Sequence, residues 1–227
     1  MKSSVLHIVV AAGSGSRFGA DLPKQFCDMN GIPVLMHTVE SLRQSQTGEV
    51  VVVLSSDMVE LWKDLCEKHN YDSPEIIIGG KTRWQSVKNA IAAKGDDAEI
   101  ISVHDGARPL ISAVLVRKLV ECVKGCDKAV IPAVPVTDSL RKVNSDGSNE
   151  AVDRRLFYSV QTPQVFDGNL LRRAYSEPES ALFTDDASVV ENVGATVRIY
   201  PGEPTNIKIT HPMDIAIAEL IQKGLRS

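Results

Sequence analysis

Long apolar runs, a marked excess of one charge and paired cysteines are all missing from this sequence of 227 residues. No segment approaches the roughly 20 apolar residues that cross a bilayer, so no membrane span is expected. The net charge of −4 gives no general attraction to nucleic acid or acidic lipid, so neither is expected as a partner. Any anion that the protein binds must therefore be held by a few placed cations.

Sequence signatures of zinc sites, of covalent nucleophiles and of secretion are also missing. The cysteines at 27, 66, 122 and 126 form no Cys-x-x-Cys pair and no motif with histidine, which argues against zinc. Nothing matches G-x-S-x-G or H-E-x-x-H, so no covalent nucleophile is indicated. The apolar run at the N-terminus leads directly into a glycine turn, which is typical of a first strand and not of a signal peptide. With free thiols, these features predict a cytoplasmic protein.

Apolar segments rich in β-branched residues alternate with segments of helical periodicity. This alternation predicts an α/β fold with a mainly parallel sheet covered by helices on both faces. Strands are predicted at 6–12, 49–54, 75–78, 99–104, 128–134 and 196–200, with a short one in NIKIT at 206–210. Helices are predicted at 34–43, 58–68, 83–93, 113–124 and 169–176, from 184 and from about 211, with N-caps at Ser56 or Asp57, Thr82 and Ser112.

The segment at 136–158 is polar and charged and contains the turn sequence Asn-Ser-Asp-Gly at 144–147. It predicts a β-hairpin arm, the alternative being a surface loop. Because an isolated hairpin is marginally stable in water, it must lie against its own domain or against a second subunit. No repeat or linker divides the chain, so residues 1–227 are expected to form one domain with a protruding arm.

The stretch VVAAGSGSRFGADLPKQF follows the first strand and combines glycines with two cations, Arg17 and Lys24. It is neither G-x-G-x-x-G nor a Walker loop, because the third glycine comes one place late and no Gly-Lys-Ser/Thr ends it. Backbone N–H groups at Gly13 and Gly15 can still face an anion at this edge of the sheet. Ligands of such sheets bind beyond the carboxyl ends of the strands, so this loop predicts a phosphate site.

The stretch SVHDGARP places Asp105 and Arg108 at the end of another strand. A carboxylate beside a phosphate loop is what a Mg²⁺ site needs, since Mg²⁺ takes one or two carboxylates and phosphate oxygens. The alternative is that Asp105 caps a turn or pairs with Arg108. His104, at the end of a buried strand, is interpreted as a packing residue.

Two weaker motifs complete the set. GGKTRWQSV at 79–87 is a glycine turn between a strand and a helix, suited to reading a base through backbone groups and Ser86. NIKIT carries Lys208, which taken alone is interpreted as a solvent-exposed lysine. Clustered cations, one acid and several glycine-rich strand ends predict phosphoryl or nucleotidyl transfer by positioning and charge neutralisation.

Taken in order, AAGSGSRFG with LPKQF, GGKTRWQSV, VHDGARP, VPVTDS, QTPQVF, TDDASVVE and NIKIT cover nearly the whole chain. Together they resemble the 2-C-methyl-D-erythritol 4-phosphate cytidylyltransferase family of the non-mevalonate isoprenoid pathway. The resemblance implies a Rossmann-like nucleotidyltransferase fold and a homodimer whose β-arms interlock. It also implies that CTP and a sugar-alcohol phosphate give a CDP-alcohol and pyrophosphate by direct Mg²⁺-assisted attack on the α-phosphate.

The resemblance also implies a role for individual residues of this chain. Arg17, Lys24 and Lys208 would be catalytic, holding the triphosphate and stabilising the α-phosphate under attack. Asp105 would bind Mg²⁺ beside the nucleotide. The nucleotide would be bound by Ala11, Ala12, Gly13, Gly15, Gly80, Ser86 and Asp105. The second substrate would be bound by Arg108, Ser139, Arg154, Thr162 and Thr184, with Ser139 and Arg154 reaching the neighbouring subunit's site.

Two departures and two alternatives accompany the resemblance. Ser139 stands where threonine is familiar, which keeps the hydroxyl. Glu203-Pro204-Thr205 stands where some relatives place an acid, so no second carboxylate is assigned to the metal. One alternative is a pentitol phosphate cytidylyltransferase acting on ribitol 5-phosphate. The other is a non-catalytic nucleotide-binding module, against which the presence of all the charged residues argues.

Overall fold

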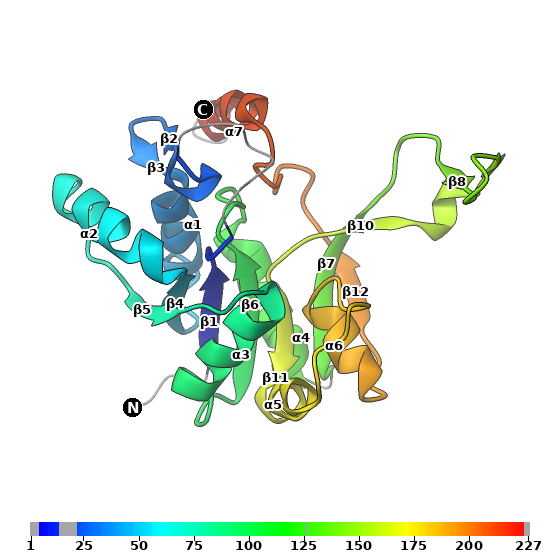
Figure 1. Ribbon diagram of the computed structural model, residues 1–227, viewed down its shortest axis with the longest axis horizontal. Coiled ribbons are helices and arrows are strands. Elements are labelled where there is room, and N and C mark those ends of the chain that lie inside the picture. Colours follow the sequence, from blue (N-terminus) through cyan, green and yellow to red (C-terminus); the bar gives the residue numbers. More distant parts are fainter. Residues whose placement is uncertain (1–4, 14–21, 126, 225–227) are drawn as a thin grey trace.

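The computed structural model describes residues 5–13, 22–125 and 127–224 and has a mixed, mainly parallel sheet at its centre (Figure 1). The strand order is β10-β7-β11-β6-β1-β4-β5, and β12 also pairs with β7. β10 and β11 run antiparallel to their neighbours, and the other pairs in this sheet are parallel. The strands are β1 (Val5–Val10), β4 (Glu49–Leu54), β5 (Glu75–Ile78), β6 (Ile100–Asp105), β7 (Ala129–Pro135), β10 (Tyr158–Val160), β11 (Gln164–Asp167) and β12 (Arg198–Pro201).

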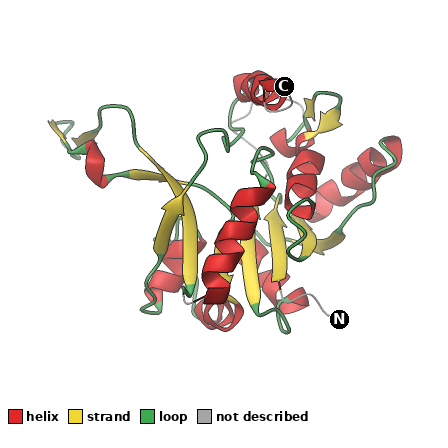
Figure 2. Ribbon diagram, turned by 180° about the vertical axis from the view of Figure 1, so that it is seen from behind, coloured by secondary structure: helices red, strands yellow, loops and turns green. Residues whose placement is uncertain are grey.

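Helices cover both faces of the sheet, as predicted (Figure 2). They are α1 (Val34–Arg43), α2 (Val59–Lys68), α3 (Arg83–Lys94), α4 (Ala113–Gly125), α5 (Gly168–Ser176), α6 (Asp186–Asn192) and α7 (Pro212–Gly224). One apolar cluster joins α1, α2 and α4 to the sheet, and a second joins α3, α5 and α6 to its other face. Val9 of β1 lies in the first cluster and Ile8 in the second, which explains why the strand is apolar throughout. Each such fully buried side chain contributes roughly 1.5–3 kcal/mol.

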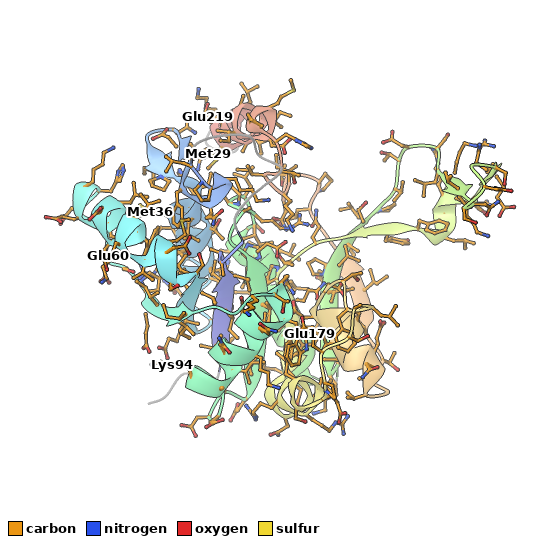
Figure 3. The ribbon with its side chains drawn as sticks, in the orientation of Figure 1. Met29, Met36, Glu60, Lys94, Glu179 and Glu219 are labelled. Atoms are coloured by element: carbon orange, nitrogen blue, oxygen red, sulfur yellow. The ribbon has the colours of Figure 1, made fainter. Side chains whose placement is uncertain are left out.

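Shorter elements fill the connections. They are a 3₁₀ turn η1 (Lys24–Phe26), the two-residue strands β2 (Asp28–Met29) and β3 (Ile32–Pro33), and 3₁₀ turns η2 (Ser56–Met58) and η3 (Arg154–Leu156). The turn between β2 and β3 fastens α7 to the body, because the Asn30 N–H donates to Glu219 over 2.8 Å (Figure 3). Among the described residues, none of the helices has both the length and the apolar character that crossing a membrane requires.

The predicted arm is a hairpin that projects away from the body of the protein (Figure 1). β8 (Arg141–Val143) pairs antiparallel with β9 (Asn149–Ala151), and all six of these residues are exposed. The turn between them is the predicted one, and the Gly147 N–H donates to the Asn144 carbonyl oxygen over 3.0 Å. Leu156 and Phe157, at the base of the arm, are also exposed.

Several local predictions were wrong. NIKIT is not a strand: the Ile209 N–H donates to the Ala107 carbonyl oxygen, and the Asn206 carbonyl oxygen accepts from the side chain of Arg108, so no neighbouring strand pairs with it. Neither Ser56 nor Asp57 is the N-cap of a helix, because both lie in η2 and α2 follows Met58 without a side-chain cap.

Other local differences concern starts and omissions. α6 begins at Asp186 and not at 184, because Asp185 and Ser188 form a capping box. β10 and β11 were not anticipated, since three and four residues give too short a pattern to identify. Thr82 and Ser112 do cap helices, accepting from the N–H groups of Gln85 and Leu115.

Candidate functional site

A cavity of about 330 Å³ lies at the carboxyl ends of β1, β5 and β6. β1 lies beside β6, only β4 separates β1 from β5, and all of these strands are parallel. The segments that follow them therefore meet at one edge of the sheet. The cavity is lined by residues predicted to hold the nucleotide and its phosphates: Ala11, Ala12, Gly13, Lys24, Gly80, Ser86, Asp105 and Lys208. Arg17 and Gly15 lie outside the described residues.

The start of the glycine-rich loop is held by a side chain that the sequence motifs did not single out. Gln25, which is 2 % exposed, donates through Nε2 to the carbonyl oxygens of Ala11, over 2.8 Å, and Gly13, over 3.0 Å. The Ala11 N–H donates to the Val53 carbonyl oxygen over 2.9 Å. Both backbone groups of Ala11 are therefore engaged within the protein, so Ala11 shapes the cavity wall.

The turn between β5 and α3 is also fixed by side chains. The Ser86 hydroxyl donates to the Thr82 carbonyl oxygen over 2.9 Å and accepts from the Gly80 N–H over 3.1 Å. A Cβ at Gly79 would lie 2.8 Å from the Cβ of Ala12, so only glycine lets this turn approach the loop after β1. The two segments that are predicted to face a nucleotide are thus packed directly together.

Asp105, at the end of β6, lies at the centre of the charged groups. Its carboxylate is 2.7 Å from Lys208 Nζ and 3.6 Å from the Nε atoms of Arg83 and Arg108. Burial alone would raise the pKa of Asp105, but the Arg83, Lys208 and Arg108 cations outweigh it and hold the pKa well below its usual range. Asp105 is therefore an ionised carboxylate, and the predicted pairing with Arg108 is also present.

A second cavity, of about 310 Å³, adjoins the first. It contains three residues predicted to hold the second substrate, Arg108, Thr162 and Thr184. Arg83, Asp105 and Lys208 line both cavities, so the charged cluster stands where the two meet.

Thr162 is tied to β6 and to the neighbouring histidine. Its Oγ1 accepts from the Asp105 N–H over 3.0 Å and lies 2.9 Å from His104 Nδ1. Burial lowers the pKa of His104 to about 4, so the ring is neutral. Since His104 Nε2 is 3.0 Å from the Arg108 carbonyl oxygen, Nε2 carries the proton and Nδ1 accepts from the Thr162 hydroxyl. His104 thus packs and positions, as interpreted from the sequence.

The two residues predicted on the arm are not in either cavity. Ser139 and Arg154 are exposed, and an Arg154 guanidinium nitrogen donates to the Thr137 carbonyl oxygen within the arm.

Within the ranges that the structure describes, no three histidine, cysteine, aspartate or glutamate side chains are grouped as ligands for a metal. Of the described residues that line both cavities, only Asp105 carries a carboxylate. That fits a Mg²⁺ ion whose remaining ligands are phosphate oxygens and water, and it does not fit a site built wholly from protein ligands.

Two charged residues of this region, Arg83 and Asp186, were missed by sequence reasoning, and Glu203 was noted there but given no role. Arg83 lies in the quoted motif GGKTRWQSV, but an arginine at a helix start is usually solvent-exposed. Asp186, within TDDAS, pairs with Arg83 over 2.7 Å, and only the fold brings these distant residues together. Glu203 accepts from the Ser112 N–H over 3.1 Å, which fastens the segment before NIKIT to the start of α4.

Known proteins resemble this chain along its length. The sequence model of the 2-C-methyl-D-erythritol 4-phosphate cytidylyltransferase family matches residues 5–224. A protein of that name from Bacteroides thetaiotaomicron is 43 % identical over 223 residues, covering 97 % of this chain and all of the relative. One of the same name from Porphyromonas gingivalis is 41 % identical over 225 residues, covering 97 % of this chain and 99 % of the relative.

Solved structures agree with these sequence relatives. The 4-diphosphocytidyl-2C-methyl-D-erythritol synthase of Anaerococcus prevotii superposes with a TM-score of 0.80 at 29 % identity, covering 96 % of this chain and 98 % of that one. The 2-C-methyl-D-erythritol 4-phosphate cytidylyltransferase of Thermus thermophilus gives 0.74 at 30 % identity, covering 98 % of this chain and all of that one. This chain belongs to the 2-C-methyl-D-erythritol 4-phosphate cytidylyltransferase family.

Proposed function

We propose that this chain transfers a cytidylyl group from CTP to 2-C-methyl-D-erythritol 4-phosphate and releases pyrophosphate. The cytidylyl transfer follows from the chain's membership of the cytidylyltransferase family. The observation that supports it most directly is the pair of adjoining cavities that share Arg83, Asp105 and Lys208. A nucleotide in the first cavity and a phosphorylated acceptor in the second would meet at this cluster.

The reaction is a direct in-line displacement. An oxygen of the acceptor phosphate attacks the α-phosphorus of CTP, that P–O bond forms, and the bond to the leaving pyrophosphate breaks. Attack of one phosphate on another brings like charges together, so positive side chains supply the main stabilisation. Lys24 and Lys208 line the nucleotide cavity and act on the α-phosphate, with Arg17 on the triphosphate.

Residues around the base and the acceptor have separate tasks. Ala12, Gly13 and Gly80 present backbone to the cytosine while Ala11 and Ser86 shape the walls. Arg108 and Thr184 bind the acceptor from the second cavity, and Thr162 holds Asp105 in place.

Asp105 would hold the divalent cation. Bound Mg²⁺ would neutralise charge on the phosphate oxygens. The carboxylate is suited to this because it is ionised and only 13 % exposed, at the junction of the two cavities. Lys208 now occupies one side of it and would be free to turn to the phosphates once Asp105 has another cation.

We further propose that residues 1–227 form one domain that works in the cytoplasm as a homodimer. The exposed arm is too short to be stable alone, and the apolar side chains of Leu156 and Phe157 at its base need a cover. A partner subunit would supply that cover. Ser139 and Arg154 would then reach the acceptor of the partner's site.

Incubation of the protein with CTP, Mg²⁺ and methylerythritol phosphate, followed by measurement of pyrophosphate, tests the proposed function. Release of pyrophosphate together with a CDP-alcohol is expected. Ribitol 5-phosphate serves as the comparison acceptor, and faster turnover of that compound would replace the proposed acceptor. Tight binding of CTP with no product from either acceptor would identify a nucleotide-binding module instead.

A further inference from the structure

A chain of polar contacts runs from the partly exposed junction of the two cavities into the interior. Arg83 Nε is 3.6 Å from Asp105 Oδ1, and Arg83 NH2 donates to Asp186 Oδ2 over 2.7 Å. The Tyr175 hydroxyl donates to the other oxygen of Asp186 over 2.6 Å. Asp186 is fully buried, and each of its carboxylate oxygens accepts a hydrogen bond from one of these two side chains, as buried polar groups require.

Local structure fixes both ends of the Arg83–Asp186 pair. Arg83 is the first residue of α3, whose N-cap Thr82 accepts from the third residue of the helix. Asp186 is the first residue of α6, which begins with a capping box. The two helix starts are joined again through Gln85, whose side chain donates over 3.1 Å to Glu179, in the segment before α6 (Figure 3).

Tyr175 is held by aromatic packing. Its ring stacks on that of Trp84 in α3, with 5.5 Å between ring centroids and 23° between planes. Lys88 Nζ, also in α3, lies 4.6 Å from the centroid of the Trp84 ring. Only 2 % of Tyr175 is exposed. The hydroxyl therefore cannot swing away from Asp186 without disturbing α3 and α5 together.

We propose that Asp186 is a positioning residue for the cytidylyl transfer, acting through Arg83 on Asp105. The inference rests on the proposed function. Arg83 pairs with Oδ1 of Asp105, whereas Arg108 and Lys208 pair with Oδ2, so the position of the carboxylate depends on the balance between these cations. Asp186 holds Arg83 back at 3.6 Å from Asp105, which leaves the closest contact, 2.7 Å, to Lys208.

Loss of the Asp186 charge releases Arg83 toward Asp105. The carboxylate then moves with the guanidinium, and the ammonium group of Lys208 loses its position beside the transferring phosphate. The hydrogen bonds of Ser86 and Gln25 that shape the base pocket do not involve Asp186 or Arg83, so the affinity for CTP is expected to change little. The effect falls on turnover, for which small displacements of the reacting groups matter most.

Two variants and a remote control test this proposal. Asp186→Asn keeps the shape and removes the charge, and Tyr175→Phe removes one hydrogen bond to the same carboxylate. A matched control lies near α2, where the Tyr71 hydroxyl donates over 2.8 Å to Glu40, which also pairs with Arg43 over 3.0 Å. Tyr71→Phe thus breaks the same kind of contact in another tyrosine–carboxylate–arginine group. Folding of each variant is checked by thermal denaturation.

Steady-state pyrophosphate release gives kcat and the KM for CTP. Asp186→Asn is expected to lower kcat about tenfold or more and Tyr175→Phe about threefold, with KM within about twofold of wild type. Tyr71→Phe is expected to leave both unchanged. If Asp186→Asn does not fold, Tyr175→Phe against Tyr71→Phe carries the comparison, and an unchanged kcat in Tyr175→Phe overturns the proposal.

A double-mutant cycle with Arg83→Gln separates positioning from a general loss of packing. If Asp186 acts through Arg83, Asp186→Asn lowers kcat no further in the Arg83→Gln protein. Independent, additive losses of kcat would overturn the proposal. Wild-type turnover is read first: an inactive wild-type protein overturns the proposed function together with this inference, whereas active wild type with unaffected variants overturns this inference alone.

Discussion

Lys208 Nζ lies 2.7 Å from Asp105 Oδ2, the shortest of the three ion pairs that the described residues make with this carboxylate. From the sequence pattern alone, Lys208 is interpreted as a lysine that points to solvent. In the structure, 44 % of its side chain is exposed, but its Nζ lies against Asp105 at the junction of the two cavities. Under the proposed function, Asp105 holds this cation beside the phosphate that is transferred.

Replacing Lys208 with alanine is expected to lower kcat by at least about 10², as removal of a group that stabilises the transition state does. The fold should survive, because Lys208 is exposed and lies outside the helices and strands. Lys94 is the matched control: it also pairs with an acid, Glu75, but at the far end of α3 (Figure 3). Equal effects of Lys208→Ala and Lys94→Ala on kcat would show that Lys208 has no specific role in the transfer reaction.

Mixing two inactive variants tests the contribution of the arm. Lys24→Ala and Arg154→Ala are each expected to lose about 10² or more of the turnover. If Arg154 acts in the partner's site, a mixed dimer contains one site with both lesions and one intact site, so mixing should restore part of the activity. Mass measurement must show that subunits exchange. Confirmed exchange without recovery would contradict a site shared between subunits.

Gln25 offers a test of the loop that faces the nucleotide. Gln25→Ala removes two hydrogen bonds to carbonyl oxygens, each worth about 0.5–1.5 kcal/mol, and should weaken CTP binding about tenfold. Calorimetric titration with CTP measures this directly. Gln222→Ala, which removes an exposed contact to Asn30, is the control. Identical CTP affinities in the two variants would show that Gln25 does not contribute to CTP binding.

Two buried histidines predict how stability depends on pH. Burial lowers the pKa of His7 and of His104 from 6.5 to about 4. Above pH 6.5 both are neutral in the folded and unfolded states. Between pH 6.5 and 4 the unfolded chain takes up protons that the folded chain refuses, so the free energy of unfolding falls, by about 3 kcal/mol per histidine.

Urea denaturation at pH 7.5 and pH 5 measures this loss of stability. His7→Gln should reduce the difference in unfolding free energy between the two pH values, whereas a change at the exposed His211 should not. A difference unaffected by His7→Gln would place the pH dependence in other groups.

Much of the fold could be predicted because its apolar strands and helical periods are strong local signals. β4 and β5 match their predicted limits because runs of β-branched residues favour strands. α1 matches its predicted limits because its apolar residues recur with a helical period. The hairpin was found from its turn residues. NIKIT was misread as a strand because alternating isoleucines suggest one, whereas its backbone partners come from a turn and an arginine side chain.

The candidate site was predictable only in part. Gly80 and Asp105 stand at strand ends and Lys208 stands in NIKIT, all in motifs that could be read from the sequence, and all three line one cavity. Arg83 and Asp186 could not be found in this way, since 103 positions separate them and their contact depends on how α3 and α6 pack on the same face of the sheet. The motifs indicate which groups meet the substrates, and the packing decides how those groups are held.

The stereochemistry at the α-phosphorus tests the central claim most directly. CTP made chiral at that phosphorus with sulfur would be used as the donor with methylerythritol phosphate, and the configuration of the product measured. In a direct attack, the bond to the acceptor forms on one side of phosphorus while the bond to pyrophosphate breaks on the other. The account therefore predicts inversion of configuration at phosphorus. Retention of configuration would require a second displacement through an enzyme-bound intermediate and would contradict it.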